Sequence, residues 1–340
     1  MTDISRRKAL RRCRCRLSRP CRHGSRGLRF RMRQAVKWNE TKEFVIIGTG
    51  FAGLAAALEA HQGGMKSDQI LILEKMSFPG GNSVINGGAV AAAGTDMQKA
   101  EGIKDSPDLL YADIIKAGGG LAHPELARHI ADESVENFYW LRDKIGVKFK
   151  AVTYHGGHSV KRSHAVESNS GAGFILPMLE RLKEVGIKPQ LRTKVEQLIV
   201  NDKGCVEGVK ARTGYTFGKE ESGKVVYIRA TKGVLLATGG FSQNVKMRMS
   251  HDPRLTAAFT STNQPRRNRR NDSAGLRKSG ARKTRIQMDW IQLGPWTSPD
   301  EQGFGVAPLF VESAVGYGPD DRSGHRQAFR QGNRQPQGSC

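Results

Sequence analysis

The stretch EFVIIGTGFAGLAAALEA, residues 43–60, decides the fold of this 340-residue chain. Residues 43–47 are a short β-branched and apolar run, which is typical of a buried parallel strand. Residues 51–61 are rich in alanine and leucine and predict a helix, and residues 69–73 are a second apolar run. The order strand, glycine turn, helix, strand is a βαβ unit, so the sequence predicts an α/β fold with a doubly wound, Rossmann-like sheet.

The turn itself, GTGFAG at residues 48–53, matches G-x-G-x-x-G in the place that a dinucleotide-binding motif requires. Gly48 allows the tight turn, Gly50 lets a pyrophosphate approach the backbone, and Gly53 lets helix and strand pack closely. The free N–H groups and the positive dipole end of the helix attract the phosphates. The alternative is a tight turn in an α/β protein that binds no nucleotide.

An acidic residue supports the nucleotide interpretation. The second predicted strand ends in Glu74, which lies 21 residues beyond Gly53. A carboxylate in this place accepts hydrogen bonds from the adenosine ribose hydroxyls and disfavours a 2′-phosphate. Because motif, context and acid agree, we favour a dinucleotide site over a bare turn.

Further glycine-rich segments favour FAD over NAD. GGNS at residues 80–83 and NGG at residues 86–88 follow Glu74 and Lys75, and ATGG at residues 237–240 ends a later predicted strand. An NAD enzyme has no need of the second segment, whereas a flavin is longer and its ring must lie against exposed backbone. Each segment alone is also typical of an ordinary turn, but together they indicate FAD.

The remaining periodicity predicts further elements and no metal site. We expect helices over residues 106–116, 124–144 and 172–185, hairpin strands over 194–200 and 205–213, and strands over 225–230 and 233–237. Ser106 and His123 each precede a proline that suits a first helical position. His155, His158 and His164 cluster near glycines and are candidates to line the flavin, although hydrogen-bonded or solvated loop histidines are more common. The five cysteines have neither disulfide nor metal-ligand spacing.

The net charge of +23 suggests a nucleic-acid-binding protein until the charges are located. Residues 1–34 hold 13 Lys or Arg and one acid, residues 266–286 nine and one, and residues 320–340 four and two. The rest of the chain is close to neutral. The sequence therefore does not support nucleic-acid binding, and no apolar run is long enough for a transmembrane helix.

The N-terminal start resembles an export signal. Arg6 and Arg7 form a twin-arginine pair, but no apolar segment follows them. Residues 1–34 are either a disordered basic leader or the product of a reading-frame slip, and we favour the slip because all three basic stretches share one composition. A complete version is expected in the periplasm, and this chain, with its defective leader, in the cytoplasm.

The segments GTGFAGLAAALEA, LEKMSFPGGNS, NGGAVAAAGTDMQK and ATGGFSQN together resemble the flavoprotein of the fumarate reductase and flavocytochrome c family of soluble enoate reductases. The resemblance implies an FAD-binding domain at residues 35–265 and a truncated capping domain at 287–319. Between them the apolar periodicity is lost in an aberrant basic stretch at 266–286, and the polar composition of residues 320–340 predicts a disordered tail. With the motif analysis, it gives as candidate cofactor-binding residues Gly48, Gly50, Ala52, Gly53, Glu74, Lys75, Asn82, Ser83, Gly87, Gly88, Val195, Thr238, Gly239 and Gly240.

The resemblance also implies a reaction. In that reaction reduced FAD would pass a hydride to the β-carbon of the activated C=C bond of an unsaturated carboxylate, and an arginine would protonate the α-carbon. An electron-donor protein such as a cytochrome would reduce the flavin. Gly294 stands where fumarate reductases have a substrate histidine, and the family's arginine is not recognisable, so the catalytic residues are unknown. We expect this chain to be impaired as a reductase, and the alternative is a non-catalytic flavin-binding remnant.

Overall fold

The computed structural model describes residues 36–119, 122–155, 157–240, 245–250, 253 and 256–257. The predicted basic leader, aberrant stretch, capping-domain fragment and tail all lie outside the described residues. The described elements belong to one compact unit that begins at Lys37. Within these residues no helix is long and apolar enough to cross a membrane.

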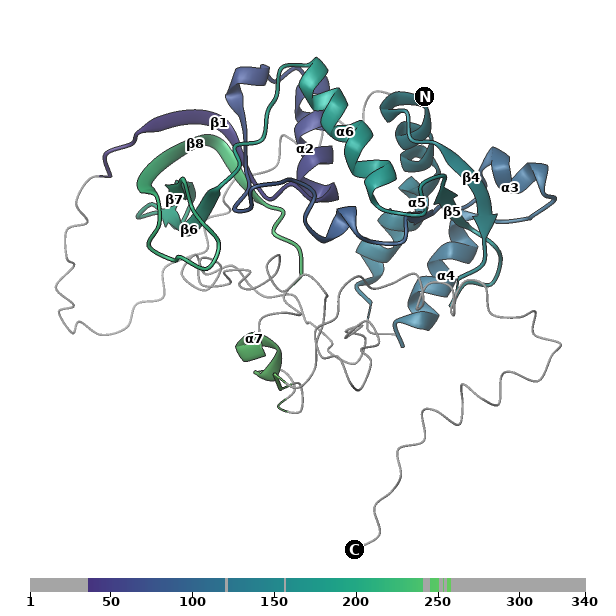
Figure 1. The fold of residues 1–340 in the computed structure, drawn as a ribbon. Helices are drawn as coiled ribbons and strands as arrows, with labels where there is room; N and C mark the ends of the chain where they lie inside the picture. The colour runs from purple at the N-terminus through teal and green to yellow at the C-terminus, as the bar shows by residue number, and fades with distance from the viewer. Residues whose placement is uncertain are drawn as a thin grey trace, which may run out of the picture. The chain divides into compact units, whose positions relative to one another are not determined.

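A five-stranded sheet forms the centre of the nucleotide-binding part (Figure 1). Its strand order is β2-β1-β8-β7-β6. Strand β1 pairs in parallel with both β2 and β8, whereas β8, β7 and β6 are joined by antiparallel ladders. The strands are β1 (Glu40–Ile47), β2 (Ile70–Leu73), β6 (Thr193–Val200), β7 (Val206–Thr213) and β8 (Lys224–Leu236).

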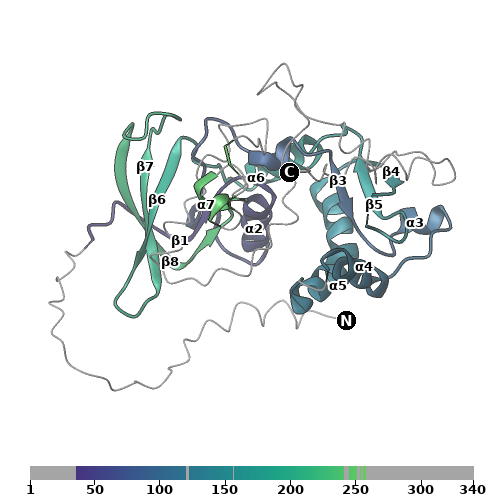
Figure 2. The ribbon, with the colours of Figure 1, turned by 90° about the horizontal axis from the view of Figure 1, so that it is seen from below.

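Strand β1 separates two apolar cores because its side chains alternate between the two faces of the sheet. Ile46 packs with helices α2 (Phe51–Gln62) and α6 (Ala172–Glu184), which lie side by side in Figures 1 and 2. Val45 and Ile47 face the other way and pack with side chains of β6, β7 and β8. The antiparallel hairpin therefore covers the face of the parallel strands opposite to the two helices.

A second, three-stranded sheet follows the first βαβ unit in the chain. Its order is β3-β5-β4, with antiparallel pairing throughout. The strands are β3 (Ala89–Ala91), β4 (Phe149–Thr153) and β5 (Ser163–Val166). The other helical elements are α3 (Asp96–Ala100), α4 (Pro107–Ala117), α5 (Pro124–Tyr139), η3 (Trp140–Ile145), α7 (Val245–Met249) and the short 3₁₀ turns η1 (Ser67–Gln69) and η2 (Gly81–Val84).

A buried ion network fixes the region around this second sheet. The Arg162 side chain, which is fully buried in the protein, donates to both oxygens of Asp105 at 2.9 and 3.1 Å and to Asp113 at 2.7 Å. Ser159 also donates to Asp113. Burial alone raises the pKa of Asp113, but the Ser159 hydrogen bonds and the Arg162 charge outweigh it, so this pKa lies below its usual value.

The predicted α/β fold with a Rossmann-like βαβ unit is confirmed, and single elements differ from the prediction. The two strands expected over residues 225–230 and 233–237 are one strand, β8, which stays paired with β1 through a register shift between Lys42 and Phe44. The helix expected over residues 124–144 leaves α geometry at Tyr139 and continues as the π-helical η3. The three-stranded sheet was not predicted.

Candidate cofactor-binding site

The turn after β1 has the geometry that only glycine accommodates. Gly48 adopts a φ of +110°, and a Cβ atom there would lie 2.3 Å from the carbonyl oxygen of Ala237. Ala237 in turn donates its backbone N–H to the carbonyl of Ile47. The structure thus brings the ATGG segment at the end of β8 directly to the first glycine turn, although the two are far apart in the sequence.

The start of α2 is open for an anion. Gly50 is its N-cap and has no side chain to satisfy the first N–H groups of the helix, and Phe51 donates its N–H to the Ser83 hydroxyl at 3.1 Å. A Cβ on Gly53 would lie 2.0 Å from the carbonyl oxygen of Gly48, so helix and turn are in close contact. A helix N-terminus without a side-chain cap, a glycine that lets the ligand approach and a nearby serine hydroxyl suit a pyrophosphate.

Glu74 lies at the end of β2 with its carboxylate held in a fixed position. The residue is buried, and its Oε2 accepts hydrogen bonds from the Thr49 hydroxyl at 2.6 Å and the Thr49 N–H at 3.3 Å. Its Oε1 accepts one from the Met76 N–H at 2.9 Å. The donors are neutral, and within the described part of the chain no cation pairs with this carboxylate.

The second glycine-rich segment is fixed by a different part of the chain. The side-chain amide of Asn86 donates to the backbone carbonyl of Ser83 and accepts from the Gly88 N–H. The backbone carbonyl of Asn86 accepts from the Gly171 N–H. A Cβ on Gly171 would lie 1.8 Å from the Ser83 carbonyl oxygen, so the residues before α6 press closely against this segment. The segment keeps Ser83 at the N-terminus of α2.

The structure places most of the predicted residues around this turn. Gly48, Gly50, Ala52 and Gly53 line the turn and helix start, and Glu74 and Ser83 contact it directly. Thr238, Gly239 and Gly240 follow Ala237 and are exposed, as is Asn82, while Lys75 and Gly87 are half-buried. Val195 is half-buried on β6, where it packs against the core of the hairpin face.

The sequence analysis missed three residues that build this site. Thr49 occupies a variable place of the motif, and its hydroxyl carries no signal in a pattern defined by glycines. Asn86 and Gly171 act by fixing the backbone around Ser83. The glycine-rich run before α6, SGAG at residues 170–173, is the signal that points to Gly171.

The three clustered histidines belong to the region of the second sheet. His164 lies fully buried in β5, where its Nε2 lies 2.8 Å from the Thr95 hydroxyl and its ring packs against Phe138. Burial lowers the pKa of His164, and burial together with the Arg162 charge lowers the pKa of His158. His164 is therefore a hydrogen-bonded interior residue with partners outside the glycine segments.

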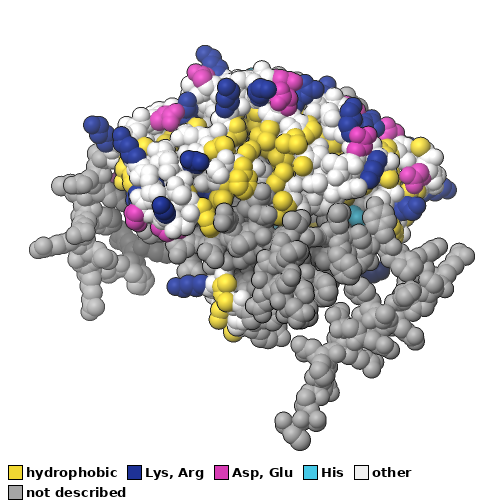
Figure 3. All heavy atoms as spheres, in the orientation of Figure 1, with side chains coloured by type: hydrophobic (Ala, Val, Ile, Leu, Met, Phe, Trp, Pro, Cys, Tyr) yellow, Lys and Arg dark blue, Asp and Glu magenta, His cyan; other side chains and the backbone are white. Residues whose placement is uncertain are grey.

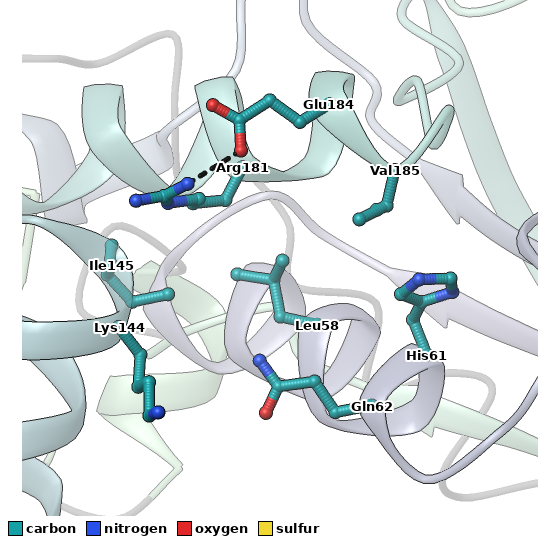
Figure 4. Close-up of a pocket in the computed structure, with 8 residues that line it drawn as sticks. All are labelled: Leu58, His61, Gln62, Lys144, Ile145, Arg181, Glu184 and Val185. Carbon is teal, nitrogen blue, oxygen red and sulfur yellow. Dashed lines mark hydrogen bonds and ion pairs between the residues drawn. The ribbon is translucent and has the colours of Figure 1, made fainter.

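A separate cavity of about 190 Å³ lies at the other end of α2, as Figure 4 shows. It is lined by residues of α2, η3 and α6 together with Val185, among them Leu58, His61 and the Arg181–Glu184 ion pair. On the face of the molecule seen in Figure 3, a band of hydrophobic side chains runs through the middle, with charges of both signs around it. The volume of the cavity is below the roughly 300–1,000 Å³ of usual ligand pockets.

The residues around the glycine turn fit an FAD molecule. The cradle has close backbone contacts where a Cβ would collide, a helix N-terminus without a side-chain cap that suits a pyrophosphate, and a buried carboxylate that suits a ribose. Among the described residues there is no cluster of three or more side chains that would hold a metal ion. The site is organised for an organic cofactor with phosphates.

Comparison with known proteins points the same way. A family model described as an FAD binding domain matches residues 43–320. The acrylate reductase flavoprotein subunit of Shewanella woodyi is 46% identical over 270 residues, which are 79% of this chain and 52% of that protein. The chain thus spans about half the length of this curated relative.

Two solved structures are similar to the described fold. A 3-ketosteroid-Δ4-(5α)-dehydrogenase from Rhodococcus jostii RHA1 has a TM-score of 0.64 and 29% identity, covering 73% of this chain and 56% of that one. A flavocytochrome c3 fumarate reductase in an open conformation has a TM-score of 0.59 and 29% identity, covering 66% of this chain and 38% of that one.

Proposed function

Because this chain belongs to the FAD binding domain family and has FAD as its cofactor, we propose that it serves a reductase that adds a hydride to an activated C=C bond of an unsaturated carboxylate. The observation that carries the proposal is the 46% identity to an acrylate reductase flavoprotein subunit over 79% of this chain. One of the similar solved structures is a fumarate reductase, and fumarate is also an unsaturated carboxylate. The resemblance to the fumarate reductase and flavocytochrome c family and the FAD cofactor, both inferred from the sequence, are confirmed by these matches.

The chain's own residues have distinct tasks in holding the cofactor. The Ala52 N–H, at the positive end of α2, would donate to the pyrophosphate beside Gly50. The Ser83 hydroxyl, which now accepts from Phe51, is placed to donate to the same phosphates. Glu74 accepts hydrogen bonds from the adenosine ribose.

The remaining candidate residues extend the site along its length. Most of them lie in segments next to Ser83, Glu74 or Ala237, which contact the turn or its immediate neighbours. On this basis we include Lys75, Asn82, Gly87, Gly88, Thr238, Gly239 and Gly240. Val195, on β6, is included on the family resemblance alone.

When bound, FAD supplies the two-electron chemistry of the reaction. The protein positions the reactants, excludes water and stabilises the charge that develops on the substrate. We assign no catalytic acid to a residue of this chain. The proton that completes the reduction requires a group beside the substrate carbon, by resemblance an arginine.

Partners and cellular location follow the same resemblance. We propose a cytochrome or similar protein as electron donor, and no nucleic acid, because the charge outside the three basic stretches is near neutral. The Arg6–Arg7 pair supports export of a complete version to the periplasm by a twin-arginine route. Because the pair is followed by no apolar segment, we propose that this chain itself stays in the cytoplasm. Fractionation of cells that express the full chain tests both statements.

A titration with FAD tests the binding half of the proposal. Replacing Glu74 with alanine removes a charge-assisted contact worth about 1.5–3 kcal/mol, so FAD affinity is expected to fall tenfold or more. Flavin fluorescence measures the affinity. The matched control is Glu180→Ala, which removes an exposed carboxylate on α6. Equal FAD affinity of the Glu74 variant and the parent would show that the carboxylate does not contact the cofactor.

A dye assay tests the chemical half. The purified chain with FAD is given a reduced viologen and a panel of enoates that includes acrylate, fumarate and urocanate. Oxidation of the dye that depends on one of these substrates supports the proposed reaction. FAD binding without turnover of any enoate would leave the flavin-binding remnant as the better description.

A further inference from the structure

Thr49 has more contacts with the cofactor site than its place in the motif requires. Its side chain is fully buried, although it stands between two glycines in a turn. The hydroxyl donates to Glu74 Oε2 at 2.6 Å and accepts the backbone N–H of Gly80 at 3.0 Å. One hydroxyl group thus joins the first glycine turn, the acid at the end of β2 and the second glycine segment.

From this geometry we infer that Thr49 is a positioning residue that sets the Glu74 carboxylate for the adenosine ribose. The inference rests on the proposed binding of FAD through Glu74. A carboxylate rotates freely about its last bond unless its oxygens are held, and a buried one aimed wrongly cannot be corrected by water. Thr49 holds Oε2 with two hydrogen bonds, one from its hydroxyl and one from its N–H. Because the carboxylate is planar and rigid, fixing Oε2 also fixes the direction of Oε1.

The acceptor capacity of Glu74 shows what remains for a ligand. An ionised carboxylate offers about four acceptor positions. Thr49 takes two of them on Oε2, and the Met76 N–H takes one on Oε1. The remaining position is on Oε1, so we infer that a ribose hydroxyl donates to this oxygen.

The choice of threonine suits this task. A β-branched side chain has few χ1 rotamers, so the direction of its hydroxyl is set before any ligand arrives. The hydroxyl donates its one hydrogen bond to Glu74, so its oxygen can accept the hydrogen bond from the Gly80 N–H. The position of the carboxylate is therefore coupled to the position of the second glycine segment.

Two substitutions separate the hydroxyl from the shape of the side chain. Thr49→Val keeps the branched shape and removes the hydroxyl, whereas Thr49→Ser keeps the hydroxyl. We expect the valine variant of the full chain to bind FAD about tenfold more weakly, which is the order of one hydrogen bond to a charged group, and the serine variant to stay within about twofold of the parent.

The specific readout is the contribution of the ribose hydroxyls. ADP and 2′,3′-dideoxy-ADP are compared as competitors of FAD, and the ratio of their affinities reports the contact to Glu74. The ratio is expected to fall in Thr49→Val and to be restored in Thr49→Ser. In a Glu74→Gln background, Thr49→Val should add little further loss, because the residue acts through the carboxylate.

The outcomes separate this inference from the proposed function. If the parent chain does not bind FAD, the proposed function fails and the inference fails with it. If the parent binds FAD and Thr49→Val keeps both its affinity and the ADP ratio, only the role of Thr49 is overturned. If Thr49→Val weakens the affinities for ADP and dideoxy-ADP to the same extent, the role of Thr49 is merely structural, and the inference is overturned as well.

Discussion

The glycine-rich site beside the five-stranded sheet and the interior around the three-stranded sheet treat buried charge in opposite ways. Glu74 is buried among neutral donors, and one of its acceptor positions stays available. The guanidinium of Arg162 is buried and forms ion pairs with two aspartates of the same chain, Asp105 and Asp113. The first arrangement leaves a charge that we propose serves a ligand, and the second pairs charges inside the fold. We therefore expect substitutions to separate into losses of cofactor and losses of stability.

The largest expected effect is the loss of Arg162. Arg162→Met leaves the carboxylates of Asp105 and Asp113 buried without a cation, which typically costs about 3–5 kcal/mol of the free energy of unfolding. Urea denaturation of the full chain measures this loss. If Arg162→Met costs less than about 1 kcal/mol, the contrast between the two regions is wrong.

A glycine in the cofactor turn should lose both stability and cofactor. Gly53→Ala places a Cβ 2.0 Å from the Gly48 carbonyl oxygen, so the backbone must shift, and overpacking of this kind costs about 1–3 kcal/mol. FAD affinity should fall with it. The matched control is Gly233→Ala in β8, where an added Cβ meets no atom within 4 Å. Equal behaviour of the two variants would refute close packing at the turn.

The histidines near the second sheet should make stability depend on pH. Burial keeps the folded-state pKa values of His158 and His164 below the usual value, so below about pH 6.5 the unfolded chain binds protons that the folded chain refuses. Stability should therefore fall as the pH drops from 7.5 to 5.5, by at most about 1.4 kcal/mol per pH unit for each histidine. Urea unfolding across this range measures the slope, which His164→Gln should reduce. A flat profile would contradict the burial of the two rings.

The smallest expected effect is that of an exposed ion pair. Lys183 and Glu180 lie on α6 with side chains 67% and 61% exposed. Lys183→Ala should change the free energy of unfolding by less than about 0.5 kcal/mol, because solvent and salt screen the pair. Measured beside Arg162→Met, it shows how much of the arginine effect comes from burial. If Lys183→Ala lowers the free energy of unfolding as much as Arg162→Met does, burial does not determine how strongly an ion pair stabilises this protein.

The first βαβ unit could be predicted from the sequence because its signals are local. An apolar run, three glycines at fixed spacing and an acid after the next run locate β1 and α2 to within three residues at each end and place Glu74 directly after β2. The three-stranded sheet has no such signal. Its strands are short, and β5 carries the polar residues Ser163 and His164 in the interior, next in the chain to Arg162 and its buried ion network. That network depends on acids from distant parts of the chain.

The site shows the same division between local and distant signals. The glycine pattern predicted the turn between β1 and α2, where we propose that the pyrophosphate binds, but it gave no indication of Thr49 because the motif leaves that position open. Strand β8 was divided in the prediction because Thr231 and Lys232 are polar and exposed. Its pairing with β1 keeps it continuous through a bulge, and pairing between distant segments is not visible in a local pattern.

The pairing of β1 with β8 also has a consequence for synthesis on the ribosome. Tyr227 of β8 donates its N–H to Asn39, which precedes it by 188 residues, and Ala237 closes the turn at Gly48. At about 5–20 residues per second, the ribosome needs roughly 10–40 s to add the second partner after the first. During that interval β1 has one open edge, and the turn for the pyrophosphate lacks one wall. Loading of the flavin therefore belongs to a late stage of the nascent chain, when β8 has left the exit tunnel.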